Sequence, residues 1–126
     1  MSRIRSKNTK PEMIVRKYLH AQGFRFRLHR KDLPGKPDIV LPKYKTVIFV
    51  HGCFWHHHKN CRYAYIPKTR KEWWLKKFEA NMTNDINAVS ILKKKGWKSM
   101  VIWECKLKTK SSVSSSLIRI KKALKK

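Results

Sequence analysis

The sequence predicts an α/β fold in which a mixed β-sheet is flanked by helices. Segments with helical periodicity alternate with short apolar runs rich in β-branched residues, and Gly and Pro separate them. The predicted order is helix, three strands, a loop rich in histidine and cysteine, a long helix, a strand and a final helix. At 126 residues the chain is long enough for one domain with its own core and too short for two.

The first helix is expected to begin near residue 9 and to end at Gly23. Residues 9–12, Thr-Lys-Pro-Glu, have the form of a helix start, with Thr as the N-cap and Pro in the first turn. Apolar residues then recur at helical spacing as far as Leu19, and glycine is the residue that most often ends a helix. Residues 1–9 are expected to form a basic N-terminal arm.

Three strands are expected next. Residues 24–28 alternate apolar and basic side chains, which indicates a half-exposed strand with a basic outer face. A turn at 33–37 leads into the strand 38–41, and a turn at 42–45 leads into the strand 46–50. The last run is apolar without alternation, which predicts a central strand covered on both faces.

A long helix is expected from Lys71 to Lys95, ended by Gly96. Its apolar stripe contains one carboxylate, Asp85, which is costly to bury unless it is paired or bound to a metal. The alternative is that Asp85 lies at the edge of the stripe and reaches water. The apolar members of the stripe are Trp74, Leu75, Phe78, Met82, Ile86, Val89 and Leu92.

The C-terminal part should supply one more strand and a helix. Residues 97–104 have strand composition, and Cys105 follows directly. Residues 111–116 are mostly serine and are expected to form a polar linker, after which apolar residues among lysines predict a short amphipathic helix. The single domain 1–126 would thus end in a basic C-terminal helical segment, 111–126.

Basic residues dominate the composition. The chain carries 32 Lys and Arg against 7 Asp and Glu, a formal net charge of +25. Such a charge favours polyanions and predicts salt-sensitive binding to DNA or RNA, the alternative being a basic surface with no dedicated partner. No apolar run approaches the roughly 20 residues of a membrane-spanning helix, and no signal-peptide pattern opens the sequence.

Residues 51–61 concentrate four of the six histidines and two of the three cysteines. Cys53, His58 and Cys61 lie close enough in sequence to bind one metal ion, and thiolate and imidazole are the ligands that zinc prefers. Cys105 could supply a fourth ligand if its strand neighbours the strand that ends at residue 50. The alternative is three free thiols that only pack; three cysteines cannot all pair internally.

Other residues suit acid–base chemistry. Asp38 opens a strand after a turn and could hold Mg²⁺ against a phosphodiester, although aspartate is also an ordinary turn residue. His51 and His56 suit a general base and a general acid, and the alternative for His51 is a hydrogen-bonded core histidine. His57 is left as a neighbour of the site.

Aromatic residues are frequent near the same segment. Phe54, Trp55, Trp73 and Trp74 could unstack bases by inserting into DNA, a known route to bent duplexes. The alternative is that they fill the core, as most tryptophans in small domains do.

Taken together, these segments resemble the very-short-patch-repair (Vsr) DNA mismatch endonucleases, in the family's order over residues 3–107. The match is most specific around Phe-Trp-His-His-His at 54–58. The resemblance rests on residues 33–38, 47–58, Cys61, 73–74, 81–85 and 101–105.

The resemblance implies a restriction-endonuclease-like fold with a structural zinc site. It also implies Mg²⁺-dependent nicking of the strand that carries thymine in a T:G mismatch, the product of 5-methylcytosine deamination. Double-stranded DNA would be the partner of a monomeric enzyme in the bacterial cytoplasm, associated with the nucleoid, with mismatch-repair proteins as further candidate partners. The alternatives are a restriction-type endonuclease acting on normal duplex DNA and a non-catalytic, zinc-stabilised DNA-binding module.

Site residues also follow from the resemblance. Asp38 corresponds to the metal-binding aspartate, and the carbonyl of Val50 takes the place of a second metal contact. His51 and His56 correspond to the two catalytic histidines, and Asp85 to the carboxylate that supports His51. The combination of these groups argues against a silent binding module.

The remaining implied positions are an acidic residue near the site, the zinc ligands and the intercalating aromatics. The acidic residue is Glu12, and the zinc ligands are Cys53, His58, Cys61 and Cys105. The intercalating aromatic residues are Phe54, Trp55 and Trp74.

The chain departs from the family pattern in three places. The family usually begins earlier, with a segment that grips the DNA. Cys61 follows His58 after two residues, one more than in the best-known member, and Val50 replaces a polar residue.

Overall fold

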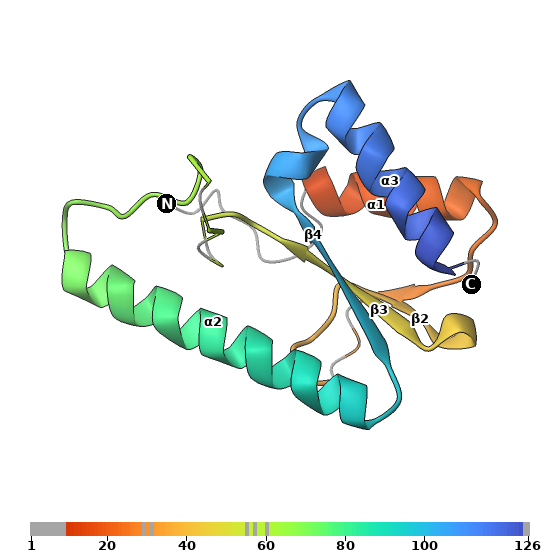
Figure 1. Ribbon diagram of the computed structural model, residues 1–126, viewed down its shortest axis with the longest axis horizontal. Coiled ribbons are helices and arrows are strands. Elements are labelled where there is room, and N and C mark those ends of the chain that lie inside the picture. Colours follow the sequence, from red (N-terminus) through yellow and green to blue (C-terminus); the bar gives the residue numbers. More distant parts are fainter. Residues whose placement is uncertain are drawn as a thin grey trace.

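The computed structural model describes residues 10–28, 30, 32–54, 56, 58–59 and 61–124. The sheet order is β1-β2-β3-β4, with the first three strands antiparallel and β3 parallel to β4 (Figure 1). The predicted mixed α/β architecture is therefore confirmed. The elements are α1 (Lys10–Ala21), β1 (Arg27–Leu28), β2 (Ile39–Leu41), the 3₁₀ helix η1 (Pro42–Tyr44), β3 (Thr46–His51), α2 (Lys71–Lys94), β4 (Lys98–Trp103), the 3₁₀ helix η2 (Glu104–Leu107) and α3 (Lys110–Leu124).

The helices cover both faces of the sheet. Helices α1 and α3 lie together on one face, where Ile48 of β3 joins their buried residues, and α2 lies on the other (Figure 1). Val47 and Phe49 of the same strand pack with Leu92 of α2. Because neighbouring residues of β3 enter different cores, the prediction of a central strand covered on both faces is confirmed.

The end of α1 also agrees with the sequence. Gly23 has a φ of 82°, in the left-handed region that glycine adopts without strain. The N–H of Phe24 donates to the carbonyl of Leu19 at 3.0 Å, which satisfies one of the last carbonyls of the helix. The predicted N-cap, Thr9, and the N-terminal arm lie outside the described residues.

Two element predictions are wrong. Strand β1 is limited to Arg27–Leu28, whereas the alternation predicted a strand over 24–28. The serine run 111–116 is part of α3 rather than a linker. Its hydroxyls have specific partners: that of Ser112 lies 2.8 Å from the Thr109 hydroxyl, at the start of the helix, and that of Ser116 donates to the Lys106 carbonyl at 3.2 Å.

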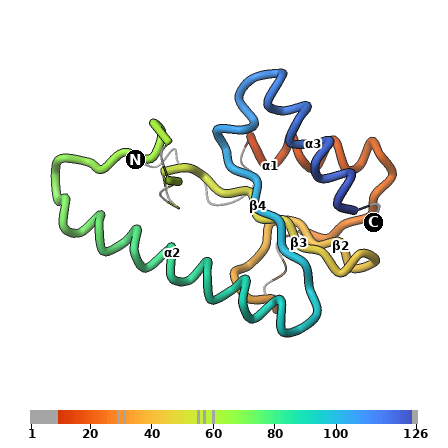
Figure 2. Tube along the Cα trace, in the orientation of Figure 1, coloured from red at the N-terminus to blue at the C-terminus, as the bar shows by residue number. Residues whose placement is uncertain are grey.

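The predicted apolar stripe of α2 is buried only in part. Phe78 and Leu92 are buried, as is Ala88, whereas Ile86 is 68% exposed. A helix of 24 residues spans about 36 Å, and a strand of six residues spans about 20 Å, so the sheet is too narrow to cover it. Figure 2 shows α2 running well beyond the strands. In the part of the chain that the structure describes, no helix is long and apolar enough to cross a membrane.

Candidate functional site: a thiol and imidazole cluster beside a histidine pair

The parallel pairing of β3 and β4 brings the candidate residues together. His51, the last residue of β3, is paired with Trp103, the last residue of β4. Cys53 and Cys105 each follow two residues later, so the chain delivers both thiols to the same edge of the sheet. Cys105 is expected to join the other three ligands only if its strand neighbours the strand that ends at residue 50, and the pairing of β3 with β4 meets that condition.

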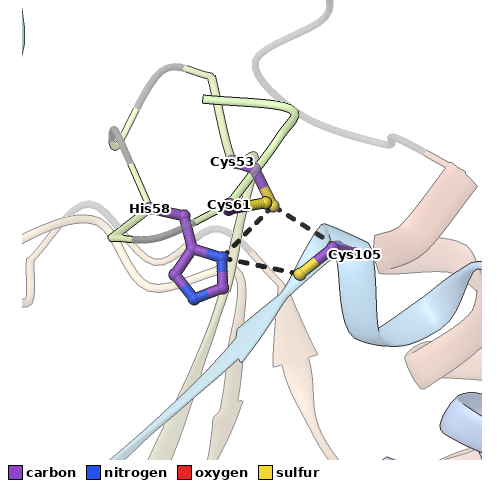
Figure 3. A group of neighbouring side chains, drawn as sticks. All are labelled: Cys53, His58, Cys61 and Cys105. Atoms are coloured by element: carbon purple, nitrogen blue, oxygen red, sulfur yellow. Dashed lines mark hydrogen bonds between the residues drawn. The ribbon is translucent and has the colours of Figure 1, made fainter. Parts of the chain in front are cut away.

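Four candidate ligands converge at this edge: Cys53, His58, Cys61 and Cys105 (Figure 3). Their ligand atoms all lie within 4.8 Å of one another. The Nδ1 atom of His58 is 3.7 Å from the Cys53 Sγ atom and 3.5 Å from the Cys105 Sγ atom. Around a tetrahedral zinc ion, sulfur and nitrogen ligands are separated by about 3.6 Å, so the donor set and its spacing fit such an ion.

Backbone hydrogen bonds fix the cluster around Cys53. The N–H of Cys105 donates to the Cys53 sulfur at 3.4 Å, and the N–H of His58 donates to the Cys53 carbonyl at 2.9 Å. The N–H of Cys53 donates to the Oε1 atom of Glu104 at 3.3 Å. The loop after β3 is thus tied to η2, the turn that follows β4, by main-chain as well as side-chain groups.

The acidity of the thiols also fits a metal centre. Burial raises the pKa of Cys53 to about 12 and raises the pKa of Cys105. For Cys61, burial acts in the same direction, but hydrogen bonds, first that from the Tyr63 backbone, outweigh it and lower the pKa. Buried thiols with raised pKa values lose their protons only to a compensating positive charge, which a bound divalent cation provides.

His51 and His56 form a stacked pair beside this cluster. Their ring centroids are 3.8 Å apart and the rings are within 4° of parallel. His51 is only 7% exposed, and its Nδ1 atom has no hydrogen-bond partner among the described residues. Burial, followed by the proximity of His56, lowers the pKa of His51 to about 4. His51 is therefore a neutral imidazole at neutral pH.

The carboxylate of Asp85 completes this group. Its Oδ2 atom lies 2.6 Å from the Nδ1 atom of His56, so Asp85 contacts His56 directly. The charge of Asp85 also acts on His51 and raises its pKa in opposition to burial, and a supporting role of Asp85 toward His51 stays a prediction. Asp85 is partly buried on the face of α2 that lies toward the loop. Both alternatives for this residue are partly right, because the carboxylate is paired and also retains some exposure.

The ligand atoms of His51, His56 and Asp85 lie within 4.8 Å of one another, close enough to suggest a second metal site. The ring geometry argues against one ion on both histidines. A metal binds imidazole nitrogen in the plane of the ring. Two parallel rings stacked 3.8 Å apart have no shared plane in which such an ion could lie. The arrangement is better suited to proton transfer.

Asp38 is anchored next to the histidine pair. Its Oδ2 atom accepts a hydrogen bond of 2.7 Å from the N–H of Val50, which precedes His51 in β3. The carboxylate of Asp38, the residue before β2, thus lies near the end of β3. Glu12 is buried in α1, where its Oε2 atom is 3.2 Å from the guanidinium of Arg16. A catalytic role for Glu12 stays a prediction.

The described aromatic residues pack against one another. Phe54 lies 5.0–5.3 Å, between ring centroids, from Tyr65 and from two rings of α2, Trp74 and Phe78. Trp73 is 45% exposed and has the guanidinium of Arg70 over its ring. In this state Phe54 and Trp74 fill space within the protein, and their insertion into DNA stays a prediction. Trp55 and His57 lie outside the described residues.

Close packing of the turn at Gly35 predicts a sensitive position. A Cβ atom at Gly35 would lie 2.7 Å from the Cβ of Ala88, one helical turn after Asp85, and the φ of Gly35 is +77°. Gly35→Ala should therefore lower the free energy of unfolding by about 2–5 kcal/mol, from a left-handed alanine together with overpacking. Urea unfolding measures the change.

The matched control for this prediction is Gly23→Ala. Gly23 also has a positive φ, +82°, but nothing lies within 4 Å of its Cβ position. Gly23→Ala should lower the free energy of unfolding only by the cost of placing an alanine in the left-handed region, about 1–2 kcal/mol. Equal losses at the two positions would contradict the role given to the contact between the turn and α2.

Comparison with known proteins defines the class as DNA endonuclease. Residues 1–62 match the family model described as DNA mismatch endonuclease Vsr. The type II nicking enzyme V.XorIIP of Xanthomonas oryzae is 49% identical over 120 residues, which cover 95% of this chain and 88% of the relative. V.NmeAIP of Neisseria meningitidis, another type II nicking enzyme, is 49% identical over 125 residues, 99% of this chain and 89% of the relative.

A third relative carries the family name itself. The DNA mismatch endonuclease Vsr of Escherichia coli is 38% identical over 118 residues, which cover 94% of this chain and 75% of the relative. The chain belongs to the Vsr family of DNA endonucleases. DNA is therefore the substrate class, which agrees with the net charge of +25.

Two residues of the site had no role in the sequence interpretation. Glu104 accepts the hydrogen bond from the Cys53 N–H, and Trp103 stacks on the His58 ring. Neither residue type is diagnostic in a strand sequence. The signal that could have found them is their place directly before Cys105, once the pairing of β3 with β4 is known.

Proposed function

We propose that this protein is a Mg²⁺-dependent DNA mismatch endonuclease that nicks the strand carrying thymine in a T:G mismatch. The observation that carries the proposal is the meeting of three kinds of group at one sheet edge. Asp38 is held by the N–H of Val50, His51 and His56 are stacked, and Asp85 is bonded to His56. Membership of the Vsr family supports this reading of the site.

Asp38 is proposed to bind the magnesium ion, together with the carbonyl of Val50. Mg²⁺ prefers oxygen ligands and is commonly held by one or two carboxylates with water and phosphate completing the shell. When bound, it would polarise the scissile phosphate and favour ionisation of water. The 2.7 Å hydrogen bond from Val50 supports this role because it orients the carboxylate.

The two histidines are proposed to have different roles. Burial keeps His51 neutral, and a neutral imidazole is able to accept a proton, so we assign His51 as the general base. Two rings stacked at 3.8 Å repel each other if both are charged. We assign the single proton to His56, which Asp85 contacts at 2.6 Å, and make His56 the general acid for the leaving oxygen.

The assignment of His51 predicts an unusual pH dependence. A base with the ordinary histidine pKa of 6.5 would lose activity as the pH falls below that value. Because burial lowers the pKa of His51 to about 4, the neutral form still predominates at about pH 5. Single-turnover nicking rates should therefore not fall as the pH is lowered from about 6.5 to about 5.5.

Bound metal must be measured at each pH, since acid also protonates thiolate and imidazole ligands. A nicking rate that halves as the pH falls through about 6.5, while the metal content stays constant, would contradict the assignment of His51 as the base.

The four-residue cluster is proposed to hold Zn²⁺ in a structural role. Three thiols and one imidazole complete a tetrahedral shell, and structural zinc sites have no open position for substrate. The ion would join the loop after β3 to η2, and thereby set the position of His56, which lies between Cys53 and His58 in the sequence.

The remaining parts of the proposal concern DNA recognition. Phe54, Trp55 and Trp74 are proposed to insert beside the mismatch, which for Phe54 requires it to leave its contacts with Trp74 and Phe78. We propose a restriction-endonuclease-like fold acting as a monomer on double-stranded DNA, with mismatch-repair proteins as further partners.

A second candidate function is nicking of fully matched DNA. The two relatives that are 49% identical to this chain are named type II nicking enzymes, whereas the relative named for mismatch cleavage is 38% identical. The two functions share the site and differ in the substrate.

One experiment separates these functions. End-labelled T:G, matched and T:A-containing duplexes of the same flanking sequence are incubated with the enzyme in Mg²⁺ or in EDTA. The proposal expects one nick, in the thymine strand of the T:G duplex, in Mg²⁺ alone. Equal nicking of matched DNA would favour the second candidate, and binding without any nicking would indicate a non-catalytic module.

A further inference from the structure

Trp103 contacts both parts of the site. The indole is stacked on the ring of His58, with centroids 4.0 Å apart and planes within 7°. It also meets His51 at 5.1 Å and 74°, an edge-to-face contact. A tryptophan at the end of β4 therefore lies between a candidate metal ligand and the ring assigned as the base.

These contacts continue as far as α2. His51 stacks on His56 at 3.8 Å, and the Nδ1 atom of His56 lies 2.6 Å from Asp85. Four rings in successive contact thus connect the cysteine cluster to the histidine pair. Backbone pairing supports the arrangement, because His51 and Trp103 are register partners in the parallel strands.

His51 needs such support from its neighbours. A reactive histidine is usually oriented by a hydrogen bond to one of its ring nitrogens. The Nδ1 atom of His51 is buried without a hydrogen-bond partner among the described residues. Packing therefore contributes to the orientation of the ring, and in the part of the chain that the structure describes the rings that contact it are Phe49, His56 and Trp103.

Of these three rings, Trp103 is the one stacked on a cluster residue, whereas His56 is linked to the cluster through the loop that carries Cys53 and His58. Phe49 lies in the core between β3 and α2, and its position does not depend on the loop. An ion bound by His58 would restrain the imidazole on which the indole is stacked. We propose that Trp103 is a positioning residue, through which the metal-bound cluster holds His51 in its reactive orientation. The inference rests on the proposed function of His51 as the base.

The experiment compares Trp103→Leu with Trp103→Phe in the zinc-loaded protein. Leucine removes the ring, whereas phenylalanine retains an aromatic face that can stack on His58. Trp97→Leu is the matched control, because Trp97 lies just before β4 and packs in the core on the α2 side, away from the histidines. Zinc content, thermal unfolding and DNA affinity are measured for each variant.

Two further measurements test positioning. The first is the single-turnover nicking rate, which should fall about 10-fold to 100-fold in Trp103→Leu with unchanged DNA affinity. The second is the nuclear Overhauser effect between the ring protons of His51 and His56, which should be lost in Trp103→Leu. Trp103→Phe should retain the Overhauser effect and most of the rate, and Trp97→Leu should be within about twofold of the wild-type rate.

Retention of either the rate or the Overhauser effect in zinc-bound Trp103→Leu would overturn the inference. If Trp103→Leu loses its zinc, the result for Trp103→Phe is decisive. Loss of both the nicking rate and the Overhauser effect in a zinc-bound Trp103→Phe protein would also overturn the inference. A wild-type enzyme that fails to nick would count against the proposed function, while the Overhauser measurement in the same samples would still test the position of His51.

Discussion

Asp38→Asn is expected to abolish Mg²⁺-dependent nicking while leaving the fold unchanged. The amide keeps the size of the carboxylate, and its oxygen can still accept the hydrogen bond from the Val50 N–H. It lacks the negative charge that a hard divalent cation requires. We expect a loss of about 10²–10³-fold in single-turnover rate, as for removal of a group that stabilises transition-state charge.

The control for Asp38→Asn is Asp32→Asn in the preceding segment. Asp32 is exposed, and its carboxylate pairs with Arg30, with an Oδ1 to Nε distance of 2.9 Å. Because such surface pairs contribute little, Asp32→Asn should leave both the rate and the unfolding midpoint nearly unchanged. An Asp38→Asn protein that nicks at the rate of Asp32→Asn would remove Asp38 from the proposed site.

The metal cluster was largely predictable from the sequence. Thiols and imidazole at 53, 58 and 61 are unusual enough to suggest a shared ion, and the uninterrupted apolar run 46–50 predicts the central strand before them. The sequence alone does not show whether Cys105 lies near the other three ligands. That depends on which strands pair, and the parallel register of β3 with β4 is a tertiary property that local periodicity does not contain.

The errors have a common physical origin in packing between distant segments. Periodicity correctly located α2, but the burial of its stripe depends on the width of a sheet formed elsewhere. The contact between Asp85 and His56, which the sequence did not indicate, likewise depends on how the loop after β3 lies against that helix. The serines within residues 111–116 have lower helix propensity than alanine, which caps and contacts such as that of Ser116 with Lys106 override.

His58→Ala is expected to release the metal and destabilise the protein, whereas His56→Ala should retain the metal and cost much less stability. The two histidines are separated by one residue in the same loop, so they form a matched pair. His58 lies within 3.7 Å of two cluster sulfurs, and its loss leaves raised-pKa thiols to bind an ion without their fourth ligand. Apparent zinc-binding free energies of about 10–16 kcal/mol in small domains set the scale of the loss.

The readouts are zinc per protein by atomic emission, the unfolding midpoint, and the nicking rate. His58→Ala and Cys105→Ala should each lower the zinc content well below one equivalent and lower the midpoint, as should a strong chelator added to wild type. His56→Ala should retain the metal and lose about 10²–10⁴-fold in rate, the range of a general acid or base. Wild-type protein with less than about half an equivalent of zinc would contradict the structural role that the four-ligand set predicts.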